Sequence, residues 1–327
     1  MSTEHATERQ PGPQATLSVI VVSYNTRDLT LTALRSLYDN ADYPFELIVL
    51  DNASDDGSAT AVEHAFPSAR LIQSSRNLGF AGANNEAVRY ATGEALLLLN
   101  PDTEVLPGAI RRLMALRAAH PDAGIWGGST VYADGTPNRS SCWRRQTLWS
   151  LLVQATGLSS LARRSQWLNP ERVLDLAGQK PIPVDIVSGC MLLVNRALFQ
   201  RLGGFSPGFF MYGEDADLCL RAQEEGANPL VEPGACIVHH GGASERVRAE
   251  KLVRLITAKA TLIHVHFPGG RKRVGLVLLA AWPLSRMLAH RLLTALGFTR
   301  YREQAQAWTR VWGQRREWLA GFPERSA

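Results

Sequence analysis

The first half of the chain repeats one pattern, in which a short apolar run ends in polar residues and a segment with helical spacing follows. The clearest apolar runs are 17–25 (LSVIVVSYN), 46–54 (ELIVLDNAS) and 94–104 (EALLLLNPDTE). Such runs are typical of strands buried on both faces of a parallel sheet, while the spacing over 29–38 predicts a helix. We therefore predict an α/β fold, with a Rossmann-like, mostly parallel sheet flanked by helices.

Weaker segments of the same kind continue the alternation. Strands are predicted at 70–73 and 124–131, helices at 79–92 and from 107 to about 120, and a strand followed by a helix within 184–199. Residues 134–183 are rich in Arg and Trp and show no clear period, so they are predicted to form an irregular insertion.

Three of the predicted strands end in polar side chains, which places Asn25, Asp51 and Asp102 at one edge of the sheet. Ligands of open α/β sheets bind just beyond this edge. Asp102 is suited to hold a hard divalent cation that bridges two phosphates, although Asn-Pro-Asp is also ordinary turn chemistry. Asp51 is suited to accept hydrogen bonds from a nucleobase or ribose, or to cap a turn together with Asn52.

Two further motifs carry candidate ligand contacts. RNLGFAGANNEA (76–87) is neither a dinucleotide fingerprint nor a P-loop, so its glycines, Gly79 and Gly82, indicate either close approach to a ligand or tight helix packing. His239 and His240 end the apolar run CIVHHGG. Imidazole binds metals such as manganese, but here a metal site would need a carboxylate partner such as Asp102.

FFMYGEDADLCLRAQEEG (209–226) places three acids directly after an aromatic stretch. If a helix begins near Glu214, Asp215 lies on the side that becomes apolar, in the first turn, where the helix dipole favours its ionised form. Such a carboxylate can accept a proton from an acceptor hydroxyl, although a helix cap would also explain it. Asp217 stands four residues before Arg221, which predicts a surface or structural ion pair.

SVIVVSYN, DNASDDGS, NLGFAGANN, LLLLNPD, FFMYGEDADLCLR and HHGG occur in this order over 17–242. Together they resemble the inverting family-2 glycosyltransferases with the GT-A fold, in particular the rhamnosyltransferase-like branch. The resemblance implies a nucleotide-diphosphate-sugar donor, with dTDP-rhamnose ahead of UDP-sugars, and a divalent cation, Mn²⁺ or Mg²⁺.

The resemblance also assigns roles to individual residues. Asp215 matches the catalytic base and Glu214 would support it. Asp102 and His239 would hold the metal, although Asn100 stands where the family's metal motif has its first acid. The donor would be contacted by Ser23, Tyr24, Asn25, Asp51, Gly79, Asn100 and Asp102.

Charge is distributed unevenly along the chain. Residues 251–327 carry 14 Lys and Arg against 3 Asp and Glu, a net charge of +11, and the first 250 residues carry −6. A basic tail indicates an anionic partner, and without a recognised nucleic-acid module we expect an anionic membrane and no nucleic acid. Residues 271–298 are apolar but interrupted by Pro283 and Arg286, so we expect a segment too short to span a membrane, which lies in its interface or packs on protein.

The predicted domains are a disordered lead-in over 1–15, a GT-A catalytic domain over 16–250 and a basic helical region over 251–327. Four scattered cysteines and a polar start without a signal peptide indicate a cytoplasmic enzyme, peripheral on the inner face of the membrane. The expected activity is transfer of rhamnose to a hydroxyl of a cell-surface glycan or a polyprenyl-linked acceptor. The alternative is a catalytically silent glycan-binding or scaffold protein on the same fold.

Overall fold

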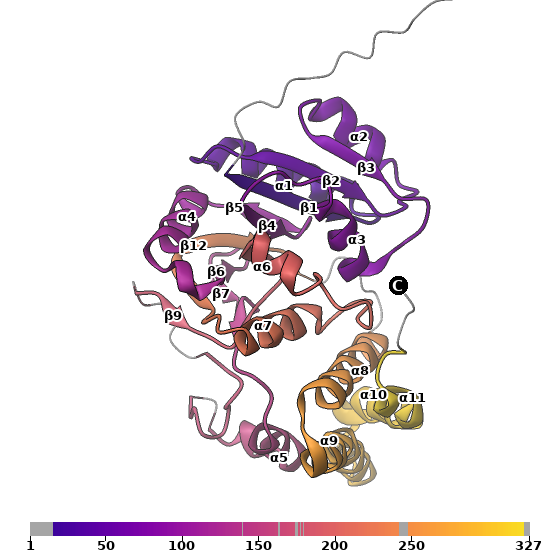
Figure 1. Ribbon diagram of the computed structural model, residues 1–327. Coiled ribbons are helices and arrows are strands. Elements are labelled where there is room, and N and C mark those ends of the chain that lie inside the picture. The colour runs from indigo at the N-terminus through magenta and orange to yellow at the C-terminus, as the bar shows by residue number, and fades with distance from the viewer. Residues whose placement is uncertain are drawn as a thin grey trace, which may run out of the picture.

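A computed structural model describes residues 16–138, 140–162, 164–173, 176, 178, 180–241 and 248–323. The predicted lead-in over 1–15 lies outside them. Figure 1 shows a central twisted sheet with helices on both faces and a group of helices at one end. The predicted α/β fold is confirmed.

Within the described residues ten strands form the central sheet, and eight of them follow the order β3-β2-β1-β4-β11-β6-β12-β5. Their bounds are β1 Leu17–Ser23, β2 Glu46–Asp51, β3 Arg70–Gln73, β4 Ala95–Leu99, β5 Thr103–Val105, β6 Ile125–Val131, β7 Pro137–Asn138, β9 Ile182–Pro183, β11 Met191–Asn195 and β12 Leu230–His239. β11 runs antiparallel to both β4 and β6, and the short strands β5, β7 and β9 pair antiparallel. The other strands run parallel, so the ends of β1, β2, β4, β6 and β12 meet at one edge.

The two faces of the sheet bury two separate apolar clusters. Along β1, Leu17, Val19 and Val21 pack on one side and Ile20 and Val22 on the other, as strand alternation requires. The first side is covered by α1 (Arg27–Asn40), α2 (Ser58–Ala65) and α4 (Ala109–Ala119). The second is covered by α3 (Gly79–Val88), α6 (Arg196–Arg201) and α7 (Glu214–Glu224).

The region over 134–183, predicted to be irregular, contains regular elements. They are β7, β8 (Cys142–Trp143), α5 (Leu148–Thr156) and β9, and β8 pairs with β10 (Ile186–Val187). Thr147 and Ser150 form a reciprocal capping box at the start of α5. The prediction missed α5 because a nine-residue helix gives little periodic signal, and its cap uses Ser rather than the usual Glu or Gln at the third position.

The C-terminal residues fold into α8 (Arg248–His266), α9 (Gly269–Ala295), α10 (Arg302–Gly313) and α11 (Arg315–Ala320). They bury a third apolar cluster, to which Leu151 of α5 also belongs. α9 continues through Pro283, and an 18-residue window of it has a mean hydropathy of 1.3 with 17% of the window buried. By length and composition α9 is therefore able to cross a membrane, so the expectation that this segment is too short was wrong.

Candidate active site

A cleft of about 790 Å³ opens at the edge where the parallel strands end. Because β11 runs the other way, the loop that precedes it, with Ser188, Gly189 and Cys190, reaches the same edge. The first turn of α7 and one side of α8 complete the walls. The topology therefore gathers segments that are more than 200 residues apart in sequence around one cavity.

Asp102 and His239 face each other in this cleft, with 3.4 Å between Asp102 Oδ1 and His239 Nε2. They meet because β12 pairs with β5, which sets His239 opposite Thr103. Both side chains are only slightly exposed. The neighbouring His240 turns to another carboxylate, with its Nε2 2.6 Å from Glu104 Oε1, so His239 is the histidine placed beside Asp102.

The donor set at Asp102 fits a hard divalent cation. Asn100 also lines the cleft, and its buried Oδ1 has no hydrogen-bond partner among the described residues. Carboxylate and amide oxygens with one imidazole suit Mn²⁺ or Mg²⁺. Burial raises the pKa of the nearby Cys190 thiol to about 12, so this side chain offers no thiolate. The described residues contain no group of three or more His, Cys, Asp or Glu that could hold a metal, so the other ligands would have to come from substrate and water.

Of the other predicted donor contacts, Tyr24 and Gly79 line the cleft. Gly79 has φ +72°, and a Cβ there would lie 2.5 Å from the Phe210 carbonyl oxygen, so tight packing alone requires this glycine. Ser23 and Asn25 do not line the cleft. The Ser23 hydroxyl lies 2.8 Å from that of Thr30 in α1, and Asn25 Oδ1 accepts from the Asp55 backbone N–H.

Asp51 is buried behind the cleft rather than in its wall. Its Oδ2 accepts a 3.0 Å hydrogen bond from the Ser54 backbone N–H, which is the turn-capping role that the sequence left open. Its Oδ1 is buried and has no partner among the described residues. One acceptor of this carboxylate therefore remains available beside the loop that follows β2.

Asp215 and Glu214 begin α7, as predicted, and both line the cleft. Asp215 accepts hydrogen bonds from the backbone N–H groups of Gly189 (3.0 Å) and Ala216 (2.8 Å). Burial nevertheless raises the pKa of Asp215, so desolvation outweighs both these bonds and the expected helix dipole. Burial and the adjacent Asp215 charge raise the pKa of Glu214 to about 8, and its Oε2 has no partner among the described residues.

Glu214→Gln is expected to stabilise the protein at alkaline pH. A carboxyl with a pKa of about 8 when folded and 4.5 in its ordinary state binds its proton more tightly when folded. The native state therefore loses stability as pH rises from 4.5 towards 8, by a few kcal/mol at most. Gln cannot ionise, so the variant should have a larger free energy of unfolding than the wild type at pH 8.5 but not at pH 5. Urea titrations at the two pH values measure this difference.

Glu63→Gln is the matched control, because Glu63 is an exposed glutamate on α2. It should leave the pH dependence unchanged. If Glu214→Gln altered stability equally at pH 5 and pH 8.5, Glu214 would not be a proton-binding group in this pH range.

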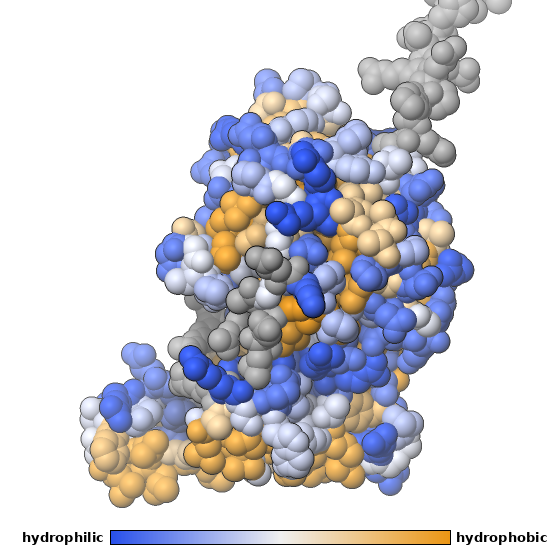
Figure 2. All heavy atoms as spheres, turned by 90° about the vertical axis from the view of Figure 1, so that its left-hand side faces the viewer, coloured by the Kyte–Doolittle hydropathy of each residue, from blue (hydrophilic) through white to orange (hydrophobic). Residues whose placement is uncertain are grey.

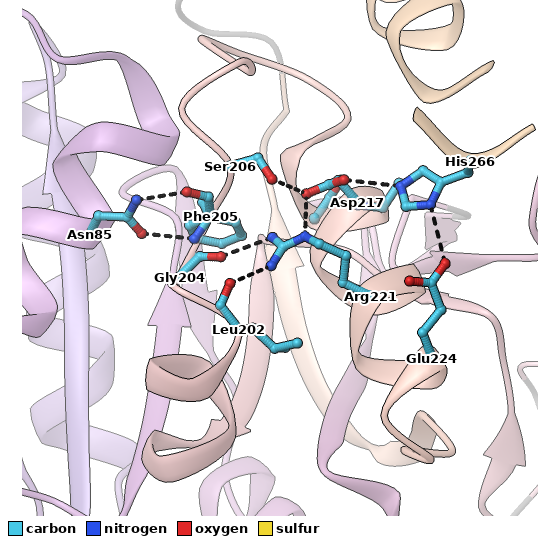
Figure 3. A network of polar contacts seen from close by, with 11 residues as sticks. Asn85, Leu202, Gly204, Phe205, Ser206, Asp217, Arg221, Glu224 and His266 are labelled. Carbon is cyan, nitrogen blue, oxygen red and sulfur yellow. Dashed lines mark hydrogen bonds and ion pairs between the residues drawn. The ribbon is translucent and has the colours of Figure 1, made fainter. Parts of the chain in front are cut away.

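Asp217 takes no part in the cleft and instead ties three elements together (Figure 3). It is 1% exposed and accepts hydrogen bonds from Ser206 Oγ (2.5 Å) and Arg221 Nε (2.8 Å), and His266 Nε2 lies 3.0 Å from its other oxygen. Burial would raise its pKa, but the His266 hydrogen bond, the Arg221 charge and Ser206 lower it. The predicted pair with Arg221 is present, as a buried structural pair that also holds α8 against α7.

The cleft also has a wall that the sequence did not predict. Trp143 at the end of β8 lines it with the next three residues, Arg144, Arg145 and Gln146, and so does one side of α8. The α8 residues are Lys251, Leu255, Ala258, Lys259, Leu262 and His266. Their spacing of three and four residues is that of a helix face, but nothing in the sequence shows which cavity that face meets.

Comparison with known proteins agrees with this architecture. The sequence model of the family described as "Glycosyl transferase family 2" matches residues 18–203. An N-acetylglucosaminyl-diphospho-decaprenol L-rhamnosyltransferase of Mycobacterium tuberculosis is 29% identical over 235 residues, which are 68% of this chain and 76% of that protein. A low-salt glycan biosynthesis hexosyltransferase of Haloferax volcanii is 26% identical over 65% of this chain and 63% of its own length.

Solved structures with GT-A folds are similar as well. A mannosyltransferase of Pyrobaculum calidifontis in complex with GDP-Man and Mn²⁺ has a TM-score of 0.57 at 19% identity, over 91% of this chain and 85% of that one. S. aureus TarS in complex with UDP-GlcNAc has a TM-score of 0.52 at 17% identity, over 93% of this chain and 81% of that one. The chain belongs to glycosyl transferase family 2, is rhamnosyltransferase-like and has the GT-A fold.

Proposed function

We propose that this glycosyltransferase is an inverting enzyme that moves L-rhamnose from dTDP-rhamnose to a hydroxyl of a lipid-linked or cell-surface glycan. The observation that carries the proposal is the cleft, in which the Asp102–His239 pair and the buried Asp215 share one cavity at the strand ends. The relative that acts on N-acetylglucosaminyl-diphospho-decaprenol supports the rhamnose donor and the lipid-linked acceptor.

In the proposed reaction, Asp215 accepts the proton of the acceptor hydroxyl. The hydroxyl oxygen forms the new bond to the anomeric carbon as the bond from that carbon to the diphosphate oxygen breaks, and the nucleoside diphosphate leaves with the bonding electrons. A single displacement from the opposite side inverts the anomeric configuration. Glu214, whose raised pKa keeps it protonated at neutral pH, adds no second negative charge beside the base.

Asp102 and His239 would hold the divalent cation, with Asn100 Oδ1 next to them. When bound, such a cation neutralises charge on the diphosphate leaving group. Structural relatives with Mn²⁺ support a divalent cation in the family. Arg144, Lys251 and Lys259 also line the cleft, where cationic side chains suit an acceptor that carries a diphosphate, although Lys259 Nζ already pairs with Glu171 Oε2 at 2.8 Å.

We further propose that the enzyme is cytoplasmic and that its basic C-terminal helices contact the anionic inner face of the membrane. The tail charge of +11 and the apolar α9 support this location. Removal of the tail would not test it cleanly, because α8 also forms a wall of the cleft.

A donor screen tests the proposed activity. With Mn²⁺ and a polyprenyl-diphosphate-linked N-acetylglucosamine acceptor, we expect faster release of nucleoside diphosphate from dTDP-rhamnose than from UDP- or GDP-sugars. If no donor released nucleoside diphosphate, with or without acceptor, the result would instead favour a catalytically silent glycan-binding protein. A faster reaction with a UDP-sugar would keep the enzyme class and change the sugar.

A further inference from the structure

Large apolar side chains that remain exposed are concentrated in two segments of the chain. Among the described residues, eleven of the fourteen exposed large hydrophobic side chains lie within 149–167 or 265–298. Single exposed apolar residues are normal on a soluble protein, whereas a contiguous group marks an interaction surface. In Figure 1, α5 and α9, which carry most of them, lie side by side at the lower end of the molecule.

α9 has an apolar side that the protein does not cover. At 100° per residue, its exposed large apolar side chains, together with that of the residue just after the helix, fall within an arc of about 100°. They are Val274, Val277, Leu288, Leu292 and Leu296. The opposite side, with Gly275, Leu279, Pro283 and Met287, is buried. α9 is therefore apolar on two sides, of which one is buried in the protein and the other stays exposed towards both ends of the helix.

α5 joins this outward side at its middle. Ser285, which falls in the same arc of α9, donates a 2.7 Å hydrogen bond to the Ala155 carbonyl oxygen. Leu151 of α5 is buried in the same apolar cluster as Leu279. The segment over 148–168, which contains α5, is thus anchored on α9, and its own exposed side chains extend the apolar surface.

Two tryptophans of this segment, both exposed, contact each other. Trp149 Nε1 donates a 2.8 Å hydrogen bond to the Trp167 carbonyl oxygen, and the two rings meet edge to face at 5.1 Å. Trp167 is 74% exposed and Leu161 75%. Figure 2 shows apolar residues gathered along the lower edge of the molecule. We call this surface the apolar base, and it comprises Trp149, Leu152, Leu161, Trp167, Val274, Val277, Leu288, Leu292, Leu296 and Phe298.

The two segments that carry the apolar base are basic in sequence. Residues 265–302 contain seven Lys and Arg and no Asp or Glu, and residues 144–170 contain four Arg and no acid. A second copy of the chain would bring the same positive surface against itself, which disfavours self-association. Exposed apolar side chains, tryptophans and flanking cations together match the interface of an anionic bilayer.

We propose that the inserted α5 segment and α9 form one composite membrane-docking surface, the apolar base, for an anionic bilayer. This inference rests on the proposed membrane contact and extends it to residues 148–168, far from the basic tail in sequence. α8 connects the two sites, since Lys251 and Lys259 line the cleft while Ile256 and Ile263 pack in the cluster under α9. A lipid-linked acceptor in the same bilayer would then meet the cleft beside its own membrane.

Site-specific fluorescence tests the composite surface without any donor or acceptor. In a Cys236→Ser background, Leu161→Cys and Leu292→Cys are each labelled with an environment-sensitive dye, since the other three cysteines are buried. Vesicles containing phosphatidylglycerol should shift the emission of both labels to the blue. Pure phosphatidylcholine vesicles should bind at least about tenfold less protein. Glu63→Cys on the exposed side of α2 is the control label and should not respond.

Two other outcomes would overturn the proposal. A shift at position 292 alone would confine the contact to α9, and an equal shift caused by raising the protein concentration without lipid would indicate self-association. Leu161→Ser together with Trp167→Ser should lower vesicle binding at least about fivefold while the melting temperature stays near that of the wild type. Because vesicle binding is measured without turnover, failure of the proposed transfer reaction would not be mistaken for failure of this surface.

Discussion

Asp215→Asn is expected to lower the rate of sugar transfer by at least about 10²-fold, the usual contribution of general-base catalysis. Asn retains the size of Asp and can still accept the backbone hydrogen bond from Gly189, so the start of α7 should be preserved. It cannot accept the proton of the acceptor hydroxyl. Turnover should therefore fall while the affinity for nucleoside diphosphate, measured by calorimetry, stays within about twofold of the wild type.

The pH dependence gives a second sign of the same role. Asp215 must be ionised to act as a base, and burial raises its pKa above the ordinary value of 3.8. Turnover should therefore fall as pH decreases through this raised pKa, and it should not recover at lower pH. Normal turnover by Asp215→Asn would remove this residue from the chemistry.

Asp217→Asn is the matched control for that experiment, since it makes the same change two residues further along α7. The ion pair with Arg221 that the sequence predicts would by itself imply only a modest loss of stability. The structure corrects that expectation, because the change also removes the charge that His266 and Ser206 face inside the protein. Breaking a buried pair typically costs about 3–5 kcal/mol, so a clear fall in melting temperature is expected. At a temperature where the variant is folded, turnover should stay near that of the wild type.

Asp102→Ala is expected to abolish the metal-dependent part of donor binding. Asn100 provides no second carboxylate, so the only carboxylate beside His239 in the described cleft would be lost. Losing a charged ligand should lower the affinity for nucleoside diphosphate in Mn²⁺ by about 10- to 100-fold, to the value found without metal. Calorimetry of dTDP with and without Mn²⁺ measures this difference directly.

Glu104→Ala is the control for the Asp102 experiment. Glu104 is a neighbouring carboxylate that contacts His240 instead of His239. Its removal should leave the metal-dependent affinity unchanged. If Glu104→Ala abolished that affinity and Asp102→Ala did not, the metal would be held by the other carboxylate–histidine pair.

The sequence alone was sufficient for the sheet and for one edge of the site. Buried parallel strands require continuous apolar runs, so β1, β2 and β4 are visible as such, and each ends within two to five residues of its predicted end. The polar residues after those runs had to share an edge because parallel strands end on the same side. Helical spacing puts Asp215 and Asp217 on different sides of α7, and in the structure Asp215 lines the cleft while Asp217 pairs with Arg221. Glu214 lines the cleft as well, which the spacing did not indicate.

Only the tertiary structure decided which distant residues meet. The pairing of β12 with β5 brings His239 to Asp102, and the reversed direction of β11 brings the Gly189 backbone to Asp215. The raised pKa of Asp215 could not be predicted either, because desolvation depends on the atoms packed around a group and the helix dipole pointed the other way. The apolar base is the clearest case. The exposed sides of α5 and α9 are apolar like the buried ones, so the sequence alone shows neither which side is buried nor that the two helices meet, and only their packing shows which side is left uncovered.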